Sequence, residues 1–144
     1  IDAVKSNSLD ETISTPFGTL SVKEASSKFL IKQDPIYLSY ITDIGFTKGN
    51  VDKLSSLQLS VDAAFIESSF KDSERERAEK RHHLTTAQSA CLAKLLGAKK
   101  YYPFHFSQIY QRMPGEVKEE AQDFYNRYTK EPELYLACLK DQPY

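Results

Sequence analysis

The sequence predicts an α/β fold in which a mixed sheet carries helices on one face. The main observation is that short runs of β-formers alternate with helical patterns along the chain. Val61–Ile66 is continuously apolar, as a strand buried on both faces of a sheet should be. The chain has 144 residues, 40% of them hydrophobic, which is enough for one domain with a core. We therefore expect a single domain over residues 1–144.

The amino-terminal part predicts one helix after a weakly patterned start. Residues 1–15 are polar, and we expect them to be mobile or to be the remnant of a preceding element. Thr19 or Ser21 can cap a helix over Val22–Leu30, because a hydroxyl there can bond the exposed N–H groups of the first turn. The helix should end before Asp34-Pro35, since the residue before a proline avoids the helical region.

The middle of the chain predicts two strands and two helices. Ile36–Thr42 is rich in β-formers, and Val61–Ile66 is the second strand. Between them, Asn50 can cap a short helix with Val51, Leu54 and Leu57 facing inward. Ser73–Arg81 is a run of charged residues, which predicts a helix with a solvated surface.

The last part predicts two helices with a short strand between them. Thr85 and Gln88 fit a capping box, because a hydroxyl and an amide three residues apart can bond each other's backbone N–H groups. The helix that they begin should stop at Gly97. Lys99–Phe104 is then a short strand, and Gly115–Thr129 is a helix with an apolar stripe.

The three expected strands each run into a residue that can bind metal or transfer protons. These residues are Asp43, Glu67 and His105, and a fourth such residue, His83, lies just before a helix start. Loops from different strands converge outside the carboxyl ends of the strands in sheets with helical crossovers. One aspartate, one glutamate and two histidines at that edge would form a hydrolytic metal site.

Each of these four residues also has an ordinary structural explanation. Asp43 could be a plain turn residue, and Glu67 could form a salt bridge or a helix-cap contact. His83 could belong to an exposed histidine pair after a charged helix. His105 lies between aromatic residues and could be a core histidine with satisfied hydrogen bonds. Their shared position at the strand ends favours the functional interpretation.

Composition and motifs limit the classes of function. The net charge is −1 and the pI is near 6.4, so charge alone does not suggest a nucleic-acid ligand, and a local basic patch stays open. The sequence contains no G-x-G spacing and no G-x-S-x-G motif. Cys91 and Cys138 lack metal-type spacing, and we expect them to be reduced thiols of a cytoplasmic protein. No apolar run approaches the ~20 residues of a membrane span, so we expect no membrane partner.

Four blocks of the sequence resemble the carboxyl-terminal half of the metallo-β-lactamase fold, in its ribonuclease Z-like branch. They are YITDIGF (Tyr40–Phe46), DAAFIESSF (Asp62–Phe70), HLTTAQ (His83–Gln88) and FHFSQIY (Phe104–Tyr110). Their order and spacing match over residues 36–110. The resemblance implies that the sheet and its helices are half of an αββα sandwich.

The resemblance also implies roles for the four residues. Asp43 resembles the carboxylate that bridges two metal ions, and His105 resembles a ligand of the second ion. His83 resembles the histidine that protonates the leaving oxygen while an acidic residue such as Glu67 holds it. The expected cofactor is a pair of zinc ions, with another divalent metal as the alternative.

Three departures from the family pattern bear on activity. The His-x-His-x-Asp-His block of the amino-terminal half and a further histidine ligand are absent, since the only histidines are His82, His83 and His105. Ser107-Gln108-Ile109-Tyr110 replaces the usual Ser-Pro-Arg sequence before tyrosine, which removes an arginine contact to phosphate. No arm that grips tRNA is recognisable. We expect the chain alone to be inactive, whether it is a fragment or a natural half-protein.

Two functional hypotheses from different classes remain open. In the first, the chain is a portion of a ribonuclease Z-like phosphodiesterase, an endonuclease whose substrate could be precursor tRNA. In the second, it is a non-catalytic half-fold that acts as an interaction or structural module. Both predict a partner, either the missing amino-terminal half or a second copy of the chain as a dimer, because a sheet of three strands leaves a face or an edge without cover.

Overall fold

The computed structural model describes residues 11–16, 18–29 and 33–141, and their contacts form two compact units. The first unit comprises residues 1–35 and the second residues 36–144. The blocks that resemble the metallo-β-lactamase fold, over residues 36–110, all lie in the second unit. A single domain over residues 1–144 stays a prediction. No helix in the described residues is long and apolar enough to cross a membrane.

The first unit is a hairpin followed by a helix. Strand β1 (Thr12–Thr15) pairs antiparallel with β2 (Gly18–Ser21), and helix α2 (Val22–Phe29) follows at once. Ser21 is a helix cap, as the sequence predicted: its Oγ accepts from the Glu24 N–H at 3.2 Å. The expectation of a mobile start falls on residues 1–10, which lie outside the described residues, and on residues 12–15, which form β1.

The second unit contains a three-stranded sheet in the order β3-β4-β5. Its strands are β3 (Leu38–Ile41), β4 (Ala63–Glu67) and β5 (Lys100–Phe104), close to the predicted ranges. All the pairings in this sheet are parallel, with Tyr40 opposite Phe65 and Phe65 opposite Tyr102. The carboxyl ends of the three strands therefore lie at one edge of the sheet.

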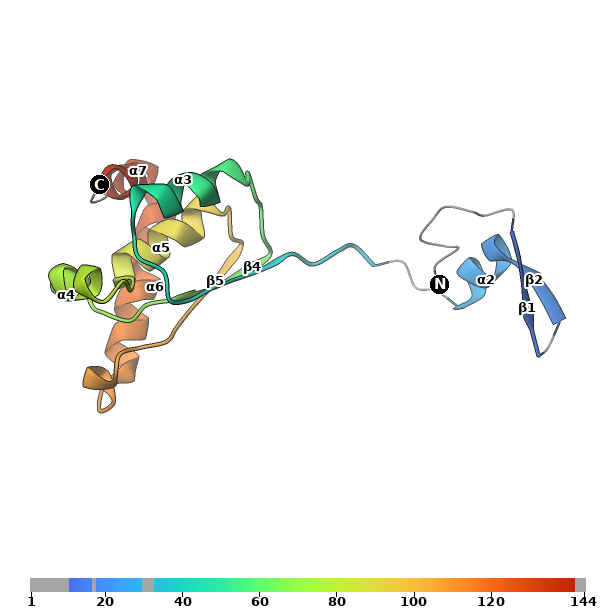
Figure 1. Cartoon of the computed structure of the whole chain (residues 1–144), viewed down its shortest axis with the longest axis horizontal. Coiled ribbons are helices and arrows are strands. Elements are labelled where there is room, and N and C mark those ends of the chain that lie inside the picture. The colour runs from blue at the N-terminus through green and yellow to red at the C-terminus, as the bar shows by residue number, and fades with distance from the viewer. Residues whose placement is uncertain (1–10, 17, 30–32, 142–144) are drawn as a thin grey trace. The chain divides into compact units, whose positions relative to one another are not determined.

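Helices and short 3₁₀ turns connect these strands and follow them (Figure 1). They are α3 (Lys48–Ser56), the 3₁₀ turn η1 (Asp72–Glu74), α4 (Arg75–Lys80), α5 (Thr86–Leu95), the 3₁₀ turn η2 (Gln108–Tyr110), α6 (Pro114–Lys130) and α7 (Pro132–Lys140). The capping box of Thr85 and Gln88 is present, and Gly97 ends α5 with a φ of 57°.

The predictions for two of these helices need correction. Thr47, not Asn50, caps α3. The Thr47 hydroxyl accepts a hydrogen bond from the backbone N–H of Asn50, with 3.3 Å between Oγ1 and N. Asn50 instead donates from its side chain to the Gly45 carbonyl at 2.9 Å. Helix α7 is absent from the sequence prediction, which treated Pro132 only as the end of the preceding helix. Proline is also suited to the first turn of a new helix, where its missing N–H has no partner to lose.

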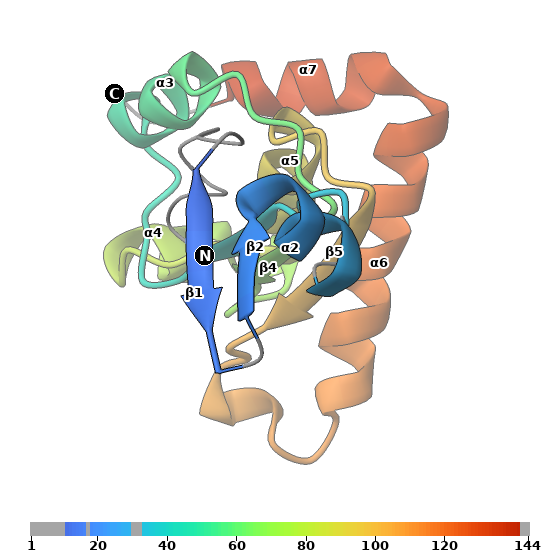
Figure 2. The same ribbon diagram turned by 90° about the vertical axis from the view of Figure 1, so that its right-hand side faces the viewer.

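Helices α5 and α6 pack on the sheet, and α6 runs beside β5 and turns into α7 at its end (Figure 2). The core between helices and sheet contains Ala64, Ile66, Leu84, Cys91, Leu92, Leu96, Tyr101, Ala121 and Cys138. Alternation along β4 and β5 directs Ile66 and Tyr101 into this core. The predicted α/β fold with helices on one face is confirmed. The sequence predicted a mixed sheet, whereas β3, β4 and β5 pair only in parallel.

The opposite face of the sheet is apolar and open within this unit. We call it the open sheet face, and it is formed by Leu38, Tyr40, Phe65, Tyr102 and Phe104. Tyr40 is 69% exposed and Tyr102 is 44% exposed. Aromatic contacts run across it, with ring centroids 4.8 Å apart for Tyr40 and Phe104 and 4.9 Å apart for Phe65 and Tyr102. Such a patch is typical of a surface that another layer covers.

Candidate metal centre

The structure brings the three predicted strand-end residues together. Asp43 lies two residues after β3, Glu67 is the last residue of β4, and His105 directly follows β5. Because the three strands are parallel neighbours, these residues emerge at the same edge of the sheet. The convergence expected from the sequence is therefore present.

The backbone at two of these positions is held in a conformation that side chains rarely adopt. Asp43 has a φ of 53° and His105 a φ of 58°, both in the left-handed region. Such residues are uncommon outside glycine, and they gather at functional sites because the surrounding structure must hold them there. This turn at the end of β3 and of β5 directs the two side chains toward the end of β4.

Glu67 is fully buried and connects the other site residues. Its Oε1 accepts from the Ile44 N–H at 3.0 Å, and its Oε2 accepts from the Ser69 hydroxyl at 3.2 Å. The same Oε2 lies 2.8 Å from His83 Nδ1 and 3.1 Å from His105 Nδ1. A buried carboxylate needs such partners, because burying an unpaired charge is expensive. Glu67 thus orients both imidazole rings.

A Schellman motif at the end of α4 positions His83. The His82 N–H bonds the Glu79 carbonyl at 3.1 Å, and the His83 N–H bonds the Ala78 carbonyl at 3.0 Å. His82 occupies the left-handed position of the motif with a φ of 55°. A bridge between Phe70 and the residues that begin α5 then holds this turn beside the end of β4. The backbone, rather than the neighbouring histidine, therefore fixes where His83 lies.

The four side chains form one compact group of donors. Asp43 Oδ1 lies 4.0 Å from the Nδ1 atoms of both His83 and His105, whose rings meet edge to face at 5.3 Å between centroids. One donor atom from each of the four residues lies within 4.8 Å of the others. The side chains of His83 and His105 are 25% and 42% exposed, so neither is a core histidine.

The chemistry of this donor set fits a divalent metal ion. Imidazole nitrogens and carboxylate oxygens are the usual protein ligands of zinc apart from cysteine. When the Nδ1–H groups of His83 and His105 donate to Glu67, their Nε2 atoms stay free to bind a metal or carry a proton. Metal-bound histidines are oriented by carboxylates in this way. The division of the four into ligands and proton donors stays a prediction.

The structure adds two polar residues that sequence reasoning missed. Thr42 Oγ1 lies 3.1 Å from His105 Nδ1 and donates to Asp43 Oδ2 at 3.2 Å. Ser69 donates to the backbone carbonyl of His105 at 2.8 Å as well as to Glu67. The signal that could have found them is their position within two residues of Asp43 and Glu67.

A buried tyrosine forms hydrogen bonds next to the site. Tyr101 lies in the core with its hydroxyl 3.0 Å from Ser68 Oγ and 2.6 Å from Ser89 Oγ. Burial raises the pKa of Tyr101 to about 12, although the two serine hydrogen bonds lower it. Tyr101 therefore links β5 to the residue after Glu67 and to α5.

Comparison with solved structures finds a protein with a similar fold. The metallo-beta-lactamase fold protein YhfI from Bacillus subtilis superposes with a TM-score of 0.50 at 16% identity, over 61% of this chain and 33% of that protein. This likeness shows that the chain has part of the metallo-β-lactamase fold. No family model matches the chain.

Sequence comparison finds likeness to part of ribonuclease Z. Ribonuclease Z from Bacteroides fragilis strain YCH46 is 31% identical over 103 residues, which are 72% of this chain and 33% of the relative. Ribonuclease Z from Deinococcus radiodurans is 30% identical over 74 residues, 51% of this chain and 22% of the relative. The chain is similar to part of ribonuclease Z and spans only a fifth to a third of these relatives. The resemblance stated from the four sequence blocks is confirmed.

Proposed function

We propose that this chain is a portion of a metal-dependent hydrolase, a ribonuclease Z-like phosphodiesterase. The observation that carries the proposal is the convergence of Asp43, Glu67, His83 and His105 within 4.8 Å. The likeness to ribonuclease Z supports a phosphodiester substrate, and precursor tRNA is the proposed one. Cytoplasmic location and endonuclease activity belong to the same proposal.

Within the site, we assign Asp43 and His105 as metal ligands and His83 as the proton donor. Zinc is the proposed metal, as a pair of ions in the complete protein, and it would polarise the phosphoryl oxygen and activate water. Glu67 holds His83 through Nδ1 at 2.8 Å, which leaves Nε2 to deliver a proton to the leaving oxygen. Glu67 is therefore a positioning residue for that proton transfer.

The chain alone should be inactive because its ligand set is incomplete. Each ion of a catalytic zinc site takes about three protein ligands plus an open position. Asp43 and His105 cannot supply that number for two ions. The remaining ligands must come from a partner, for which the open sheet face is the proposed docking surface. Its occupant is the amino-terminal half of the fold or a second copy of the chain.

Zinc titration of four variants tests the ligand assignment. Asp43→Ala and His105→Ala should weaken zinc binding by the purified chain, measured by calorimetry, whereas His83→Ala should leave it nearly unchanged. His82→Ala is the matched control, because His82 is an adjacent histidine outside the donor group. In the complete protein, His83→Ala should slow phosphodiester turnover by about a hundredfold or more. Loss of zinc from His83→Ala with full zinc in His105→Ala would show the roles to be assigned wrongly.

The alternative function is a non-catalytic half-fold that acts as an interaction or structural module. The observation that favours it is the open sheet face, with Tyr40 69% exposed in the described unit. In that case the chain would self-associate, and zinc would bind neither the chain nor its dimer. Calorimetry on the associated species separates the two functions.

A further inference from the structure

We propose that Arg81 binds the phosphodiester group of the substrate beside the metal centre. This inference rests on the proposed function and names a substrate-binding residue for it. The reasons are a cavity at the site, the absence of a competing ion pair, and a backbone turn that ties Arg81 to His83.

The first reason is the cavity into which the site opens. A cavity of about 300 Å³ is lined by His83 and His105 together with Arg81, Ser107 and Gln108. None of the described residues that line it is acidic, because Glu67 lies behind the two imidazole rings and Asp43 lies outside the lining. The lining therefore offers hydrogen-bond donors and one permanent positive charge, which is the chemistry of an anion site.

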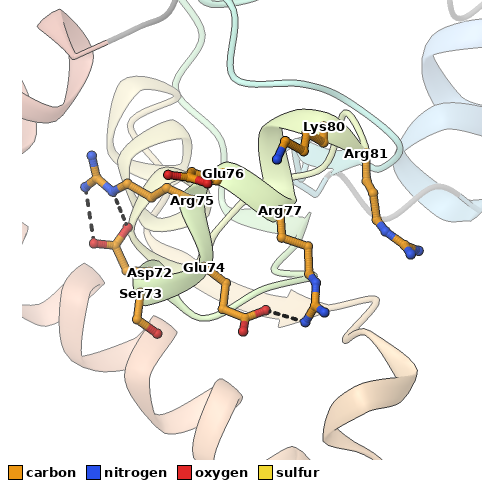
Figure 3. A pocket seen from close by; sticks show the side chains of 8 residues that line it. All are labelled: Asp72, Ser73, Glu74, Arg75, Glu76, Arg77, Lys80 and Arg81. Atoms are coloured by element: carbon orange, nitrogen blue, oxygen red, sulfur yellow. Dashed lines mark hydrogen bonds and ion pairs between the residues drawn. The ribbon is translucent and has the colours of Figure 1, made fainter.

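The second reason is that Arg81 has no ion-pair partner among the described residues, unlike the two arginines of α4. Arg75 pairs with Asp72 at 3.1 Å and Arg77 with Glu74 at 2.8 Å. Figure 3 draws the residues of a neighbouring pocket along α4, and among them dashed lines run from Arg75 and Arg77 but not from Arg81, whose side chain extends from the carboxyl end of α4. A guanidinium without an internal carboxylate keeps its donors for a ligand.

The third reason is the Schellman motif that joins Arg81 to the site. Arg81 caps α4, and its N–H bonds the Ala78 carbonyl at 3.2 Å. The left-handed residue His82 then reverses the chain, so that residues on either side of it, Arg81 and His83, both line the cavity. The turn that positions the proposed proton donor therefore also positions the cation.

A phosphodiester is the anion that this arrangement favours. The planar guanidinium matches two phosphate oxygens through parallel N–H···O bonds, and it is more weakly hydrated than an ammonium group. An anion held by Arg81 in this cavity lies next to His83 and His105. Arg81 thus supplies a phosphate contact from the end of α4.

The test is a titration of the metal-free chain with dimethyl phosphate, followed by NMR of the arginine Nε–H and histidine ring signals. Arg81→Gln should weaken dimethyl phosphate binding by about tenfold or more. The affinity of Arg81→Lys should lie between those of the wild type and Arg81→Gln, because lysine keeps the charge but lacks the paired N–H donors of the guanidinium. Arg77→Gln is the matched control, since it removes the same charge from the same helix. The inference predicts wild-type affinity for that control.

Several results would overturn the inference. They are equal losses in Arg81→Gln and Arg77→Gln, no dimethyl phosphate binding by the wild-type chain, or acetate binding as tight as dimethyl phosphate. Zinc calorimetry on the same samples keeps the proposed function separate. A chain that binds zinc but whose phosphate affinity ignores Arg81 sinks the inference alone. A chain that binds dimethyl phosphate through Arg81 but binds no zinc sinks the proposed metal site alone.

Discussion

Replacing Glu67 by glutamine should both destabilise the fold and weaken zinc binding. The substitution keeps the size of the side chain and one carbonyl oxygen, which can still accept from the Ile44 N–H. The amide nitrogen then takes the place of Oε2, which lies within 3.1 Å of both histidine Nδ1 atoms. An NH₂ group cannot accept from two Nδ1–H donors, so both rings lose the acceptor that orients them.

The size of the effect follows from these contacts. Each hydrogen bond to a charged group contributes about 1.5–3 kcal/mol, and the low end applies because the two rings reach solvent. Two such bonds give a loss of about 3 kcal/mol in the free energy of unfolding. With a urea m-value of about 2 kcal/mol per molar, the unfolding midpoint should fall by about 1.5 M. Loss of an orienting carboxylate should also weaken zinc binding by about 10–100-fold.

Urea unfolding followed by circular dichroism and zinc calorimetry measure the two effects. Glu116→Gln is the matched control, because Glu116 pairs with Lys71 at 2.6 Å on the exposed surface. That control should change the midpoint little and leave zinc affinity intact. If Glu67→Gln unfolds at the wild-type midpoint and binds zinc as tightly, Glu67 does not orient the histidines and the reasoning fails.

Three further predictions concern the rest of the unit. His82→Gly should raise the free energy of unfolding by up to about 1 kcal/mol, and with it the thermal midpoint, because glycine adopts the left-handed conformation without a penalty. A lower thermal midpoint would contradict this prediction. Tyr101 keeps its proton up to a pKa of about 12, above its ordinary 10.0, so the native state retains a proton that the unfolded chain releases. The free energy of unfolding should therefore fall as pH rises from 10 toward 12, and Tyr101→Phe should flatten that fall in urea titrations at each pH; an unchanged slope would refute it. The isolated chain should self-associate in sedimentation velocity, and Tyr40→Glu with Tyr102→Glu should shift it to monomer, whereas a wild-type monomer at high concentration would refute the prediction.

Much of the fold was predictable because local signals agree with the tertiary structure. The apolar run of β4 is visible in the sequence itself, and the capping box of α5 is local because Thr85 and Gln88 bond each other's backbone N–H groups. Helix α3 shows the limit of such reading. Both Thr47 and Asn50 are good caps, and local sequence does not show that the Asn50 side chain donates to the Gly45 carbonyl while Thr47 takes the cap position.

The site was predictable in membership but not in its connections. Parallel strand order converts three positions in sequence into one edge in space, so Asp43, Glu67 and His105 could be grouped from strand ends alone. That Glu67 contacts both imidazoles through one oxygen could not be foreseen, because it depends on the left-handed turn at His105 and on the rotamers of three side chains. The position of Arg81 depends in the same way on the turn at His82.

The hydrogen bonds of the site lie within the second unit, whereas the open sheet face has no covering layer among the described residues of that unit. In the described part of the chain, the hydrogen bonds that orient Glu67, His83 and His105 come from within residues 42–105, so this geometry forms inside the second unit. The open sheet face, in contrast, exposes aromatic rings to water, and covering it with another layer would lower the free energy of the folded unit. Association should therefore stabilise the unit and complete its ligand set without rebuilding the histidine pair. A partner that restored activity would act by adding ligands to a preformed half-site.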